Sequence, residues 1–382
     1  MKLLITAVSA ATGPSGICRH AQNLVRCAAS RREISQITLV IGKWQDSYFR
    51  SCFRLDDAKL NLVSVDISND SFSRNLWYLR GMPALAEEVG ADVIHLSFPV
   101  PVQRRALCCP VVVSLHDLYP YDEPDNFGFP RVFFNRVFLQ QCLKQVDSIA
   151  CVSETTLSRL KARFPRFAHR KGVVIPNCVS IHSVKPALPG GERRQFFLMV
   201  AQHRVNKNVP LAIKVFEELL QLGKIDGKMA LFVVGNHGPE TERIRAVIKE
   251  KALEESVQLK VGVSDRELRW LYENCELLMA PSWMEGFGLP VVEGLLCGSR
   301  VVCSDISAFR EVGGLACHYF DLHAESAVSA MLAAVCKALM EPVRRAEGLE
   351  RFTLENVARE NAALYAQLVK DTSDVEETCK AR

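Results

Sequence analysis

The 382-residue chain lacks long apolar runs, clustered cysteines and a dominant sign of charge. No apolar stretch approaches the ~20 residues that a membrane-spanning helix needs, so we expect no transmembrane segment. The 47 Lys and Arg against 43 Asp and Glu give a formal net charge of +4, which does not indicate a nucleic-acid partner. The 14 cysteines form no C-x-x-C pair, so we expect reduced thiols and a cytoplasmic location.

Two other patterns are missing. No complete G-x-G-x-x-G follows the first strand of either half, which makes an NAD-dependent oxidoreductase the least favoured class. No His, Cys or carboxylate cluster has the spacing of metal ligands, so we predict no metal and no other cofactor. The apolar run 3–8 fits either a short signal peptide or a buried first strand, and its shortness and the Gly13-Pro14-Ser15-Gly16 turn after it favour the strand.

Short β-branched runs alternate with helical patterns along most of the chain, which indicates parallel sheets covered on both faces. The predicted strands are 3–8, 37–41, 62–65, 93–96, 111–115, 149–152 and 173–175, then 196–200, 230–234, 257–261, 277–280 and 301–304. We therefore predict an α/β fold of two doubly wound, Rossmann-like domains facing across a cleft. Ligands of such sheets bind at the carboxyl ends of the strands.

The domain boundaries follow from breaks in this rhythm. The predicted parts are an N-terminal domain (1–185), a Pro- and Gly-rich linker (186–194), a C-terminal domain (195–345) and a C-terminal region (346–382). In that last region a helix from about 346 to 369 is expected to pack back toward the N-terminal domain, followed by a frayed tail.

A loop after the predicted strand 277–280 carries the strongest chemical pattern. Glu285 precedes Gly286-Phe287-Gly288-Leu289, and Glu293 lies about one turn into the helix that begins near Pro290. The glycines allow close approach of the backbone to a ligand, and free amides at a helix start favour a diphosphate. Two carboxylates beside such a loop suit sugar and ribose hydroxyls. Taken alone, the two glutamates could equally serve to favour a helix N-terminus.

The wider sequence resembles the retaining glycosyltransferases of family 4. The matching segments are Ser264 to Leu268, Pro281-Ser282, Glu285 to Pro290, Glu293-Gly294, Ser304-Asp305 and Arg310 to Gly314. The resemblance, strongest over 196–314, implies the GT-B fold, with Glu285 contacting the donor sugar and Glu293 the ribose. It also implies that amides of Gly286, Phe287, Gly288 and Leu289 hold the donor phosphate and sugar.

A leaving diphosphate needs cationic partners, which this family supplies from side chains in place of a metal. Arg204 and Lys207, in the loop after the predicted strand 196–200, are the candidates, with solvated loop cations as the alternative. Gly235, in another strand-to-helix turn, is expected to shape the backbone of the donor site. Val263 stands where family members read the base through a main-chain group.

In the first domain, the resemblance makes Gly16 part of a loop near the donor. His116 directly follows the predicted strand 111–115. Family members carry a histidine at this strand end beside the transferred sugar, although a lone histidine is more often structural. An aromatic and basic group around Arg50 and Arg54 suits ordinary packing or, alternatively, an anionic membrane surface. A further group between Arg131 and Phe138 is predicted to be a core-facing helix with a solvated edge.

These observations and the resemblance predict a glycosyltransferase, and the resemblance implies that it retains the anomeric configuration. Its catalytic residues are His116, Arg204, Lys207 and Glu285, and it moves a hexose, with mannose favoured, from a nucleoside diphosphate sugar. The expected acceptor is a saccharide or lipid-linked saccharide of cell-surface polysaccharide synthesis, with peripheral contact at the inner face of the membrane. The alternatives are a GT-B epimerase acting on the nucleotide-sugar, and a non-catalytic subunit that binds it.

Overall fold

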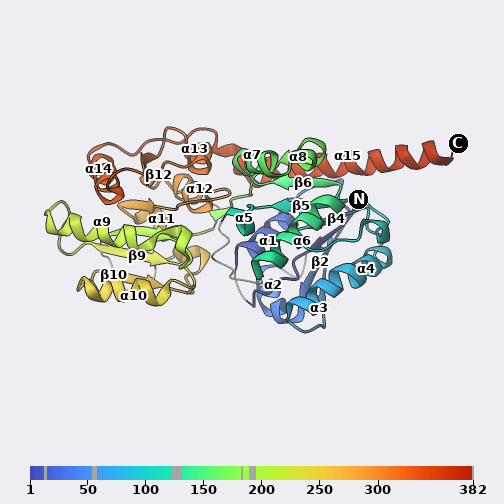
Figure 1. Cartoon of the computed structure of the whole chain (residues 1–382), viewed down its shortest axis with the longest axis horizontal. Coiled ribbons are helices and arrows are strands. Elements are labelled where there is room, and N and C mark those ends of the chain that lie inside the picture. Colours follow the sequence, from blue (N-terminus) through green and yellow to red (C-terminus); the bar gives the residue numbers. More distant parts are fainter. Residues whose placement is uncertain (13–14, 54–57, 123–130, 182–183, 189–194, 381–382) are drawn as a thin grey trace. The chain divides into compact units, whose positions relative to one another are not determined.

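The computed structural model describes residues 1–12, 15–53, 58–122, 131–181, 184–188 and 195–380. The predicted Gly13-Pro14 turn, Arg54 and most of the predicted linker (189–194) lie outside these residues. The chain forms two compact units (Figure 1). The first combines Met1–Cys178 with Glu350–Arg382, and the second is Val179–Leu349. The C-terminal segment therefore belongs to the same unit as the N-terminal sheet.

The first unit is built on a seven-stranded sheet with the order β3-β2-β1-β4-β5-β6-β7, in which every neighbouring pair is parallel. Its strands are β1 (Lys2–Thr6), β2 (Gln36–Gly42), β3 (Leu60–Val65), β4 (Val93–Leu96), β5 (Val111–Leu115), β6 (Ser148–Cys151) and β7 (Gly172–Val174). The central strands are apolar without alternation because helices cover both faces.

The helices of this unit lie between successive strands, as parallel pairing requires, except for the last helix of the chain. They are α1 (Gly16–Ala29), α2 (Asp46–Cys52), α3 (Ser71–Leu76), the π-helical turn η2 (Trp77–Gly81), α4 (Met82–Glu88), α5 (Tyr119–Asp122), α6 (Arg131–Gln145), α7 (Glu154–Arg163), α8 (Pro165–Lys171) and the C-terminal α15 (Leu354–Lys380). The long α15 packs beside α1 and against β4.

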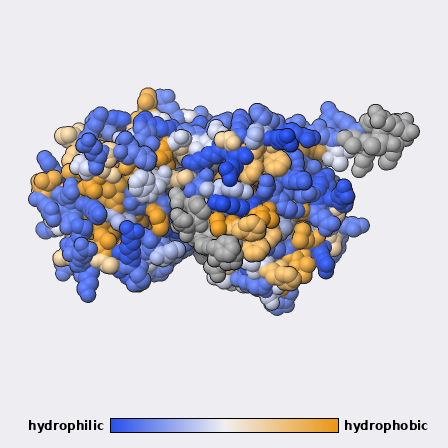
Figure 2. All heavy atoms as spheres, in the orientation of Figure 1, coloured by the Kyte–Doolittle hydropathy of each residue, from blue (hydrophilic) through white to orange (hydrophobic). Residues whose placement is uncertain are grey.

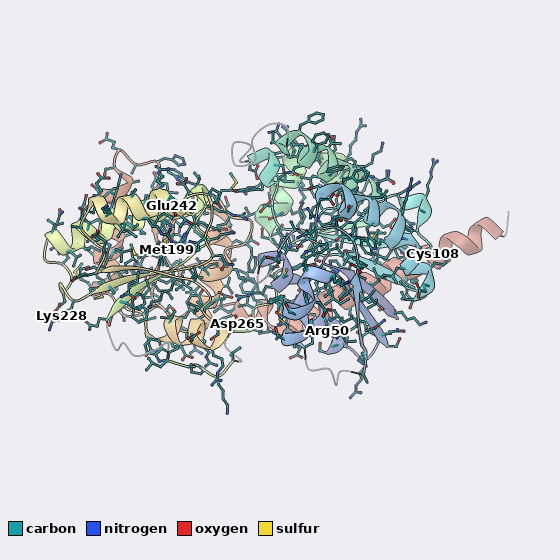
Figure 3. All side chains as sticks on the ribbon, turned by 90° about the horizontal axis from the view of Figure 1, so that it is seen from below. Arg50, Cys108, Met199, Lys228, Glu242 and Asp265 are labelled. Atoms are coloured by element: carbon teal, nitrogen blue, oxygen red, sulfur yellow. The ribbon has the colours of Figure 1, made fainter. Side chains whose placement is uncertain are left out.

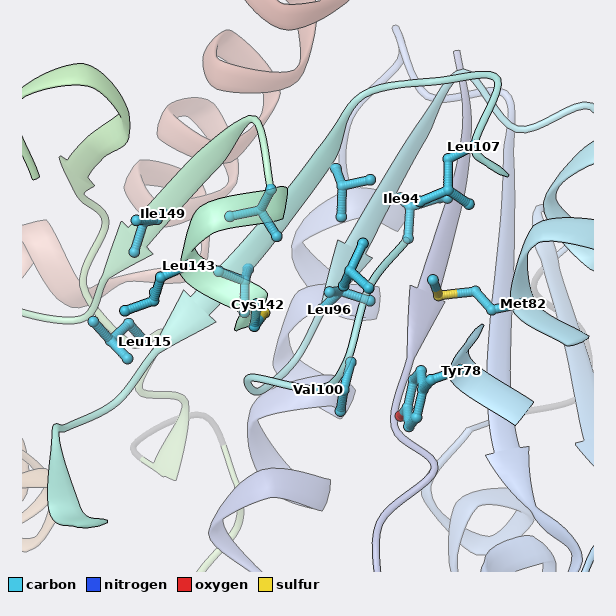
Figure 4. Packing of buried hydrophobic residues seen from close by; sticks show 14 of the residues in the cluster. Tyr78, Met82, Ile94, Leu96, Val100, Leu107, Leu115, Cys142, Leu143 and Ile149 are labelled. Carbon is cyan, nitrogen blue, oxygen red and sulfur yellow. The ribbon is translucent and has the colours of Figure 1, made fainter. Parts of the chain in front are cut away.

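Two apolar layers, one on each face of the sheet, make the core of the first unit. One layer packs η2, α4 and α6 on the strands (Figure 4). Its buried side chains include Tyr78, Met82, Cys142 and Leu143 from helices and Ile94, Leu96 and Leu115 from strands. The other layer joins α1 and α15 through residues such as Leu24 and Tyr365. Burial of α15 residues in this layer explains why the chain terminus is part of this unit.

The second unit contains a six-stranded parallel sheet with the order β10-β9-β8-β11-β12-β13. Its strands are β8 (Phe196–Val200), β9 (Ala230–Val234), β10 (Val257–Lys260), β11 (Leu277–Ala280), β12 (Val301–Ser304) and β13 (His318–Phe320). Its helices are the 3-10 turn η6 (Val205–Lys207), α9 (Val209–Gln221), α10 (Thr241–Glu250), α11 (Asp265–Asn274), α12 (Leu289–Leu296), α13 (Ser307–Gly313) and α14 (Ala327–Met340).

The two α/β sheets of the predicted fold class are confirmed, with strands at the predicted positions. Strand β13 (His318–Phe320) is an addition that the sequence did not predict. The last helix begins at Leu354 and continues to Lys380, so the prediction of a helix from 346 to 369 with a frayed tail was wrong at both ends. No helix in the described part of the chain is long and apolar enough to cross a membrane.

Candidate functional site

The loop between β11 and α12 brings the predicted Glu285 into contact with the predicted Lys207. Lys207 Nζ lies 2.5 Å from Glu285 Oε1, and Ser282 Oγ donates to the same oxygen at 2.8 Å. Both charged side chains are mostly buried, with 20% of Lys207 and 13% of Glu285 exposed. The two residues are 78 positions apart in the sequence and meet because β8 and β11 are neighbouring parallel strands.

Backbone contacts hold these two loops together. The Trp283 amide donates to the Asn206 carbonyl at 2.8 Å, and Asn206 Nδ2 donates to the Met284 carbonyl at 3.3 Å. Ser304, at the end of β12, donates to the Ser282 carbonyl at 2.5 Å. The Lys207–Glu285 pair therefore stands on three adjacent strand ends of one sheet, which is where ligands of such sheets bind.

The second predicted glutamate, Glu293, lies inside α12 and is 5% exposed. Its Oε2 accepts a hydrogen bond of 2.8 Å from the hydroxyl of Tyr272, a fully buried residue of α11. Tyr272 thus fixes the orientation of the carboxylate. No sequence pattern indicates this contact, because the two side chains come from different helices and are 21 positions apart.

The glycine loop before α12 has a conformation that requires glycine. Gly288 is the N-cap of α12 with φ of 97°, and a Cβ there would lie 2.8 Å from the Phe309 ring. Gly286 and Phe287 are buried, Leu289 is half-buried, and Pro290 is the second residue of the helix. A left-handed residue at this point turns the chain from β11 into α12.

Gly235 and Val263 lie in the loops after β9 and β10. A Cβ on Gly235 would lie 2.0 Å from the Ala201 carbonyl oxygen, so the contact that demands glycine is with the loop after β8. Val263 is half-buried and immediately precedes Ser264, which caps α11 together with Glu267. The predicted Arg204 is the N-cap residue of η6 and has an exposed side chain, in contrast to Lys207, which ends this turn.

His116 belongs to the first unit and directly follows β5. Its Nε2 lies 3.0 Å from the Ser97 carbonyl oxygen, which can only accept, so Nε2 carries a proton. Burial lowers the pKa of His116, while the Ser97 carbonyl and Asp117 act in the opposite direction. A neutral His116 consequently keeps an unprotonated Nδ1. The ring of His20 meets it edge-on, with centroids 4.5 Å apart.

Gly16 is the first residue of α1, whose N-cap is Ser15. A Cβ at Gly16 would meet nothing within 4 Å, and Gly16 is exposed. Within the described part of its unit, therefore, no neighbouring atom explains the absence of a side chain at this position.

The predicted aromatic and basic group near Arg50 combines packed aromatic rings with an exposed arginine. Arg50 pairs with Asp46 at 2.5 Å on α2, Phe49 is fully buried, and the Trp44 indole donates to the Ser9 carbonyl. Figure 3 marks Arg50 within the first unit. Ordinary packing accounts for these contacts.

The N-terminal half of α6 departs from its predicted core-facing character. Its Phe133 is 56% exposed, Phe134 49% and Val137 42%, and apolar residues gather on this face of the first unit (Figure 2). The prediction failed because the apolar residues of α6 do not form a single stripe. Leu139, Cys142 and Leu143 are buried instead. The Arg131 side chain lies outside the described residues.

Across the described residues, no three His, Cys, Asp or Glu side chains gather as the ligands of a metal would. The predicted charged residues of the second unit are Lys207, Glu285, Glu293 and the nearby Arg204. This set can offer two cations to a phosphate and two carboxylates to hydroxyl groups.

Comparison with known proteins agrees with this geometry. Residues 14–183 match the family described as Glycosyltransferase Family 4, and residues 183–337 match Glycosyl transferases group 1. The chain is 24% identical to O-antigen chain mannosyltransferase B of Escherichia coli, over 93% of this chain and 96% of the relative. It is 27% identical to O-antigen chain mannosyltransferase RfbU of Salmonella typhimurium, over 76% and 79%.

The fold is also that of solved structures. Sucrose-phosphate synthase from Thermosynechococcus elongatus superposes with a TM-score of 0.73 at 16% identity, over 97% of this chain and all of that one. Together, the two adjacent family matches and the two parallel sheets show that the chain belongs to glycosyltransferase family 4 and has the GT-B fold.

Proposed function

We propose that this glycosyltransferase moves a hexose, with mannose favoured, from a nucleoside diphosphate sugar to a saccharide or lipid-linked saccharide acceptor. The reaction would serve the synthesis of a cell-surface polysaccharide and retain the anomeric configuration. The choice of mannose is supported by two relatives whose names are O-antigen mannosyltransferases, one of them similar along nearly its whole length.

The observation that carries the proposal is the mostly buried Lys207–Glu285 pair at the carboxyl ends of the strands of the second sheet. A diphosphate entering this edge attracts the Lys207 ammonium, because a phosphate oxygen is a charged acceptor like the carboxylate. Glu285 then accepts hydrogen bonds from hydroxyl groups of the donor sugar. The Ser282 hydroxyl keeps Glu285 oriented while Lys207 changes partner.

Other residues of the second unit are proposed to contact the ribose, the base and the phosphates of the donor. Glu293, oriented by Tyr272, accepts from the ribose hydroxyls, and main-chain groups near Val263 meet the base. Amides from Gly286 to Leu289 meet the phosphate and sugar. Gly235 shapes the loop that lies against the turn carrying Lys207 and Arg204.

Transfer itself needs no enzymic nucleophile in this proposal. The acceptor oxygen attacks the anomeric carbon as the bond to the leaving phosphate oxygen breaks, and the acceptor proton passes to that phosphate. Lys207 and Arg204 stabilise the charge that develops on the diphosphate. In this proposal His116 and Gly16 contribute contacts to the transferred sugar, and the unprotonated Nδ1 of His116 accepts from one of its hydroxyl groups.

The proposal includes activity without a metal ion, because side-chain cations take the role that a metal would have at the phosphate. It also places the enzyme in the cytoplasm, at the inner face of the membrane when the acceptor is lipid-linked. The free thiols of buried cysteines such as Cys18 and Cys151 are consistent with a reducing compartment.

NMR spectroscopy of the reaction tests the proposal. The purified protein is incubated with GDP-mannose and a lipid-linked saccharide in EDTA, and the new anomeric signal is followed. An α-mannoside formed from the α-configured donor would support the proposal. A β-linked product would overturn retention, and isomerisation of the donor without an acceptor would show an epimerase instead. Binding without any turnover would indicate a non-catalytic subunit.

A further inference from the structure

A chain of polar side chains runs through the first unit from α1 to the C-terminal helix. His20 of α1 and His95 of β4 both meet the Ser114 hydroxyl, with Nε2 to Oγ distances of 2.7 and 2.8 Å. On its other side, His95 Nδ1 lies 2.5 Å from the hydroxyl of Tyr365 in α15. His95, Ser114 and Tyr365 are buried. Four side chains from four different elements thus form one continuous hydrogen-bonded path.

The end of this path on α15 fixes the positions of its protons. Asn361 Nδ2 donates to the Val357 carbonyl at 2.9 Å, so Asn361 Oδ1 faces Tyr365 at 3.3 Å. An amide oxygen only accepts. The single proton of the Tyr365 hydroxyl therefore goes to Asn361, and the hydroxyl oxygen accepts from His95 Nδ1.

The proton position on His95 determines those on Ser114 and His20. Burial lowers the pKa of His95 to about 3, so His95 is neutral and its Nε2 accepts when Nδ1 carries the proton. The Ser114 hydroxyl donates to that Nε2 and accepts from His20. Burial lowers the pKa of His20, against a hydrogen bond with the Asn177 side chain that raises it. His20 is thus neutral, and the proton that it donates to Ser114 lies on Nε2. Every donor in the path then has one acceptor.

His20 joins this path to the proposed active site. Its ring packs edge-on against His116 at an interplanar angle of 88°. His116 is held elsewhere by the Ser97 carbonyl at its Nε2. Ser114 and His116 are two residues apart at the end of β5, so the residue that anchors His20 is on the same strand end as the ring that His20 supports.

We propose that His20 is a positioning residue for His116, and that Ser114, His95 and Tyr365 set the tautomer and orientation of His20 from the C-terminal helix. The effect on transfer rests on the proposed function of His116. The effect on the tautomer does not, since it depends on the hydrogen-bonded path alone.

Tyr365→Phe tests the path directly. The substitution removes the acceptor of the His95 Nδ1 proton, and a buried N–H without a partner is less tolerable than an unused lone pair. His95 should shift its proton to Nε2, Ser114 should turn its hydroxyl to His20, and His20 should become the Nδ1–H tautomer. Long-range proton–nitrogen NMR of the histidine rings at pH 7.5 distinguishes the two tautomers.

Two further variants keep the test decisive. Asn361→Leu retains the Tyr365 ring but removes the acceptor of its proton, so the hydroxyl should donate to His95 and produce the same switch of His20. Tyr78→Phe is the matched control, because Tyr78 is a buried tyrosine of the same unit whose hydroxyl donates to the Val8 carbonyl. It should leave His20 unchanged. An Nε2–H tautomer of His20 retained in both Tyr365→Phe and Asn361→Leu would overturn the proposal.

The rate of transfer gives the second readout. Tyr365→Phe should lower kcat about tenfold through misplacement of His116 while the donor KM stays nearly constant, and Tyr78→Phe should match the parent protein. An unchanged kcat with a switched tautomer would overturn the positioning role of His20. Absence of transfer in the parent protein would instead refute the proposed function and leave the tautomer result standing.

Discussion

Lys207 and Glu285 form an ion pair of 2.5 Å, and both side chains are mostly buried. Lys207→Met should leave Glu285 without its cation and deprive the diphosphate of its partner. We expect the dissociation constant of the donor to rise at least tenfold, from loss of a charge-assisted contact worth about 1.5–3 kcal/mol. Isothermal titration calorimetry measures this constant.

Lys214→Met, on the exposed face of α9 in the same unit, removes a charge that no proposed contact uses. It should bind the donor like the parent protein. Equal affinity for the donor in Lys207→Met and Lys214→Met would remove Lys207 from the site.

Glu293 is the proposed hydrogen-bond acceptor for the ribose hydroxyls of the donor. Glu293→Gln keeps the shape of the side chain and an oxygen for the Tyr272 hydroxyl, but a neutral amide is a weaker acceptor for ribose hydroxyls. Affinity for the preferred nucleoside diphosphate should fall about tenfold. Affinity for its 2′,3′-dideoxy analogue should not change. If calorimetry shows the same loss for both nucleotides, Glu293 does not bind the ribose.

The sequence predicted the glutamates and Lys207 one by one, because each stands after a strand or in a recognisable motif. It could not predict Tyr272, since a hydrogen bond between two helices depends on how they pack. Ser282 belongs to one of the matching motifs, but its hydrogen bond to Glu285 depends on the geometry of the loop, which the sequence does not show. Nor could the sequence distinguish the paired Lys207 from the exposed Arg204, three residues away in the same turn.

At the scale of elements, the turn into α12 depends on Gly288. Gly288→Ala would combine a left-handed backbone with a Cβ 2.8 Å from the Phe309 ring. Gly298→Ala, after the end of the same helix, has φ of 80° but open space around its Cβ. We expect about 1 kcal/mol of destabilisation at Gly298 from the backbone alone and 1–3 kcal/mol more at Gly288.

Denaturant unfolding of both variants measures this difference. Only Gly288→Ala should also weaken donor binding, because it displaces the loop that carries Glu285. Equal stability of the two variants would show that the contact with Phe309 does not constrain the turn.

Strands were the most predictable elements because apolar β-branched runs buried on both faces leave a clear pattern. Strand β13 was missed because His318-Tyr319-Phe320 is a short segment with a polar residue, which pairs with β12 only in the assembled sheet. The predicted end of the last helix was wrong because the polar second half of α15 has no apolar pattern that marks where the helix stops. Its place in the first unit comes from buried residues such as Tyr365.

At the scale of the whole molecule, the buried histidines should make stability fall in acid. The pKa of His95 is about 3 in the folded protein against a usual 6.5, so the unfolded chain binds a proton there first as the pH drops. The stabilising contribution is complete above pH 6.5 and decreases toward pH 3. Through His95 alone, the free energy of unfolding should fall by about 2 kcal/mol between pH 7.5 and pH 5.

Urea unfolding of the first unit at these two pH values tests this dependence. His95→Gln replaces the imidazole by a neutral side chain and should lose less stability between the two pH values than the parent protein. The same pH dependence in both proteins would contradict the assignment of a depressed pKa to His95.

We propose that this chain binds a nucleoside diphosphate sugar through Lys207, Glu285 and Glu293 without a metal ion. Calorimetric titration of GDP-mannose in EDTA, with UDP-glucose in parallel, tests it most directly. We predict one saturable site per chain, tighter for GDP-mannose, and weaker binding in Lys207→Met and Glu293→Gln. Absence of binding to either nucleotide-sugar, or binding that requires a divalent cation, would contradict the account.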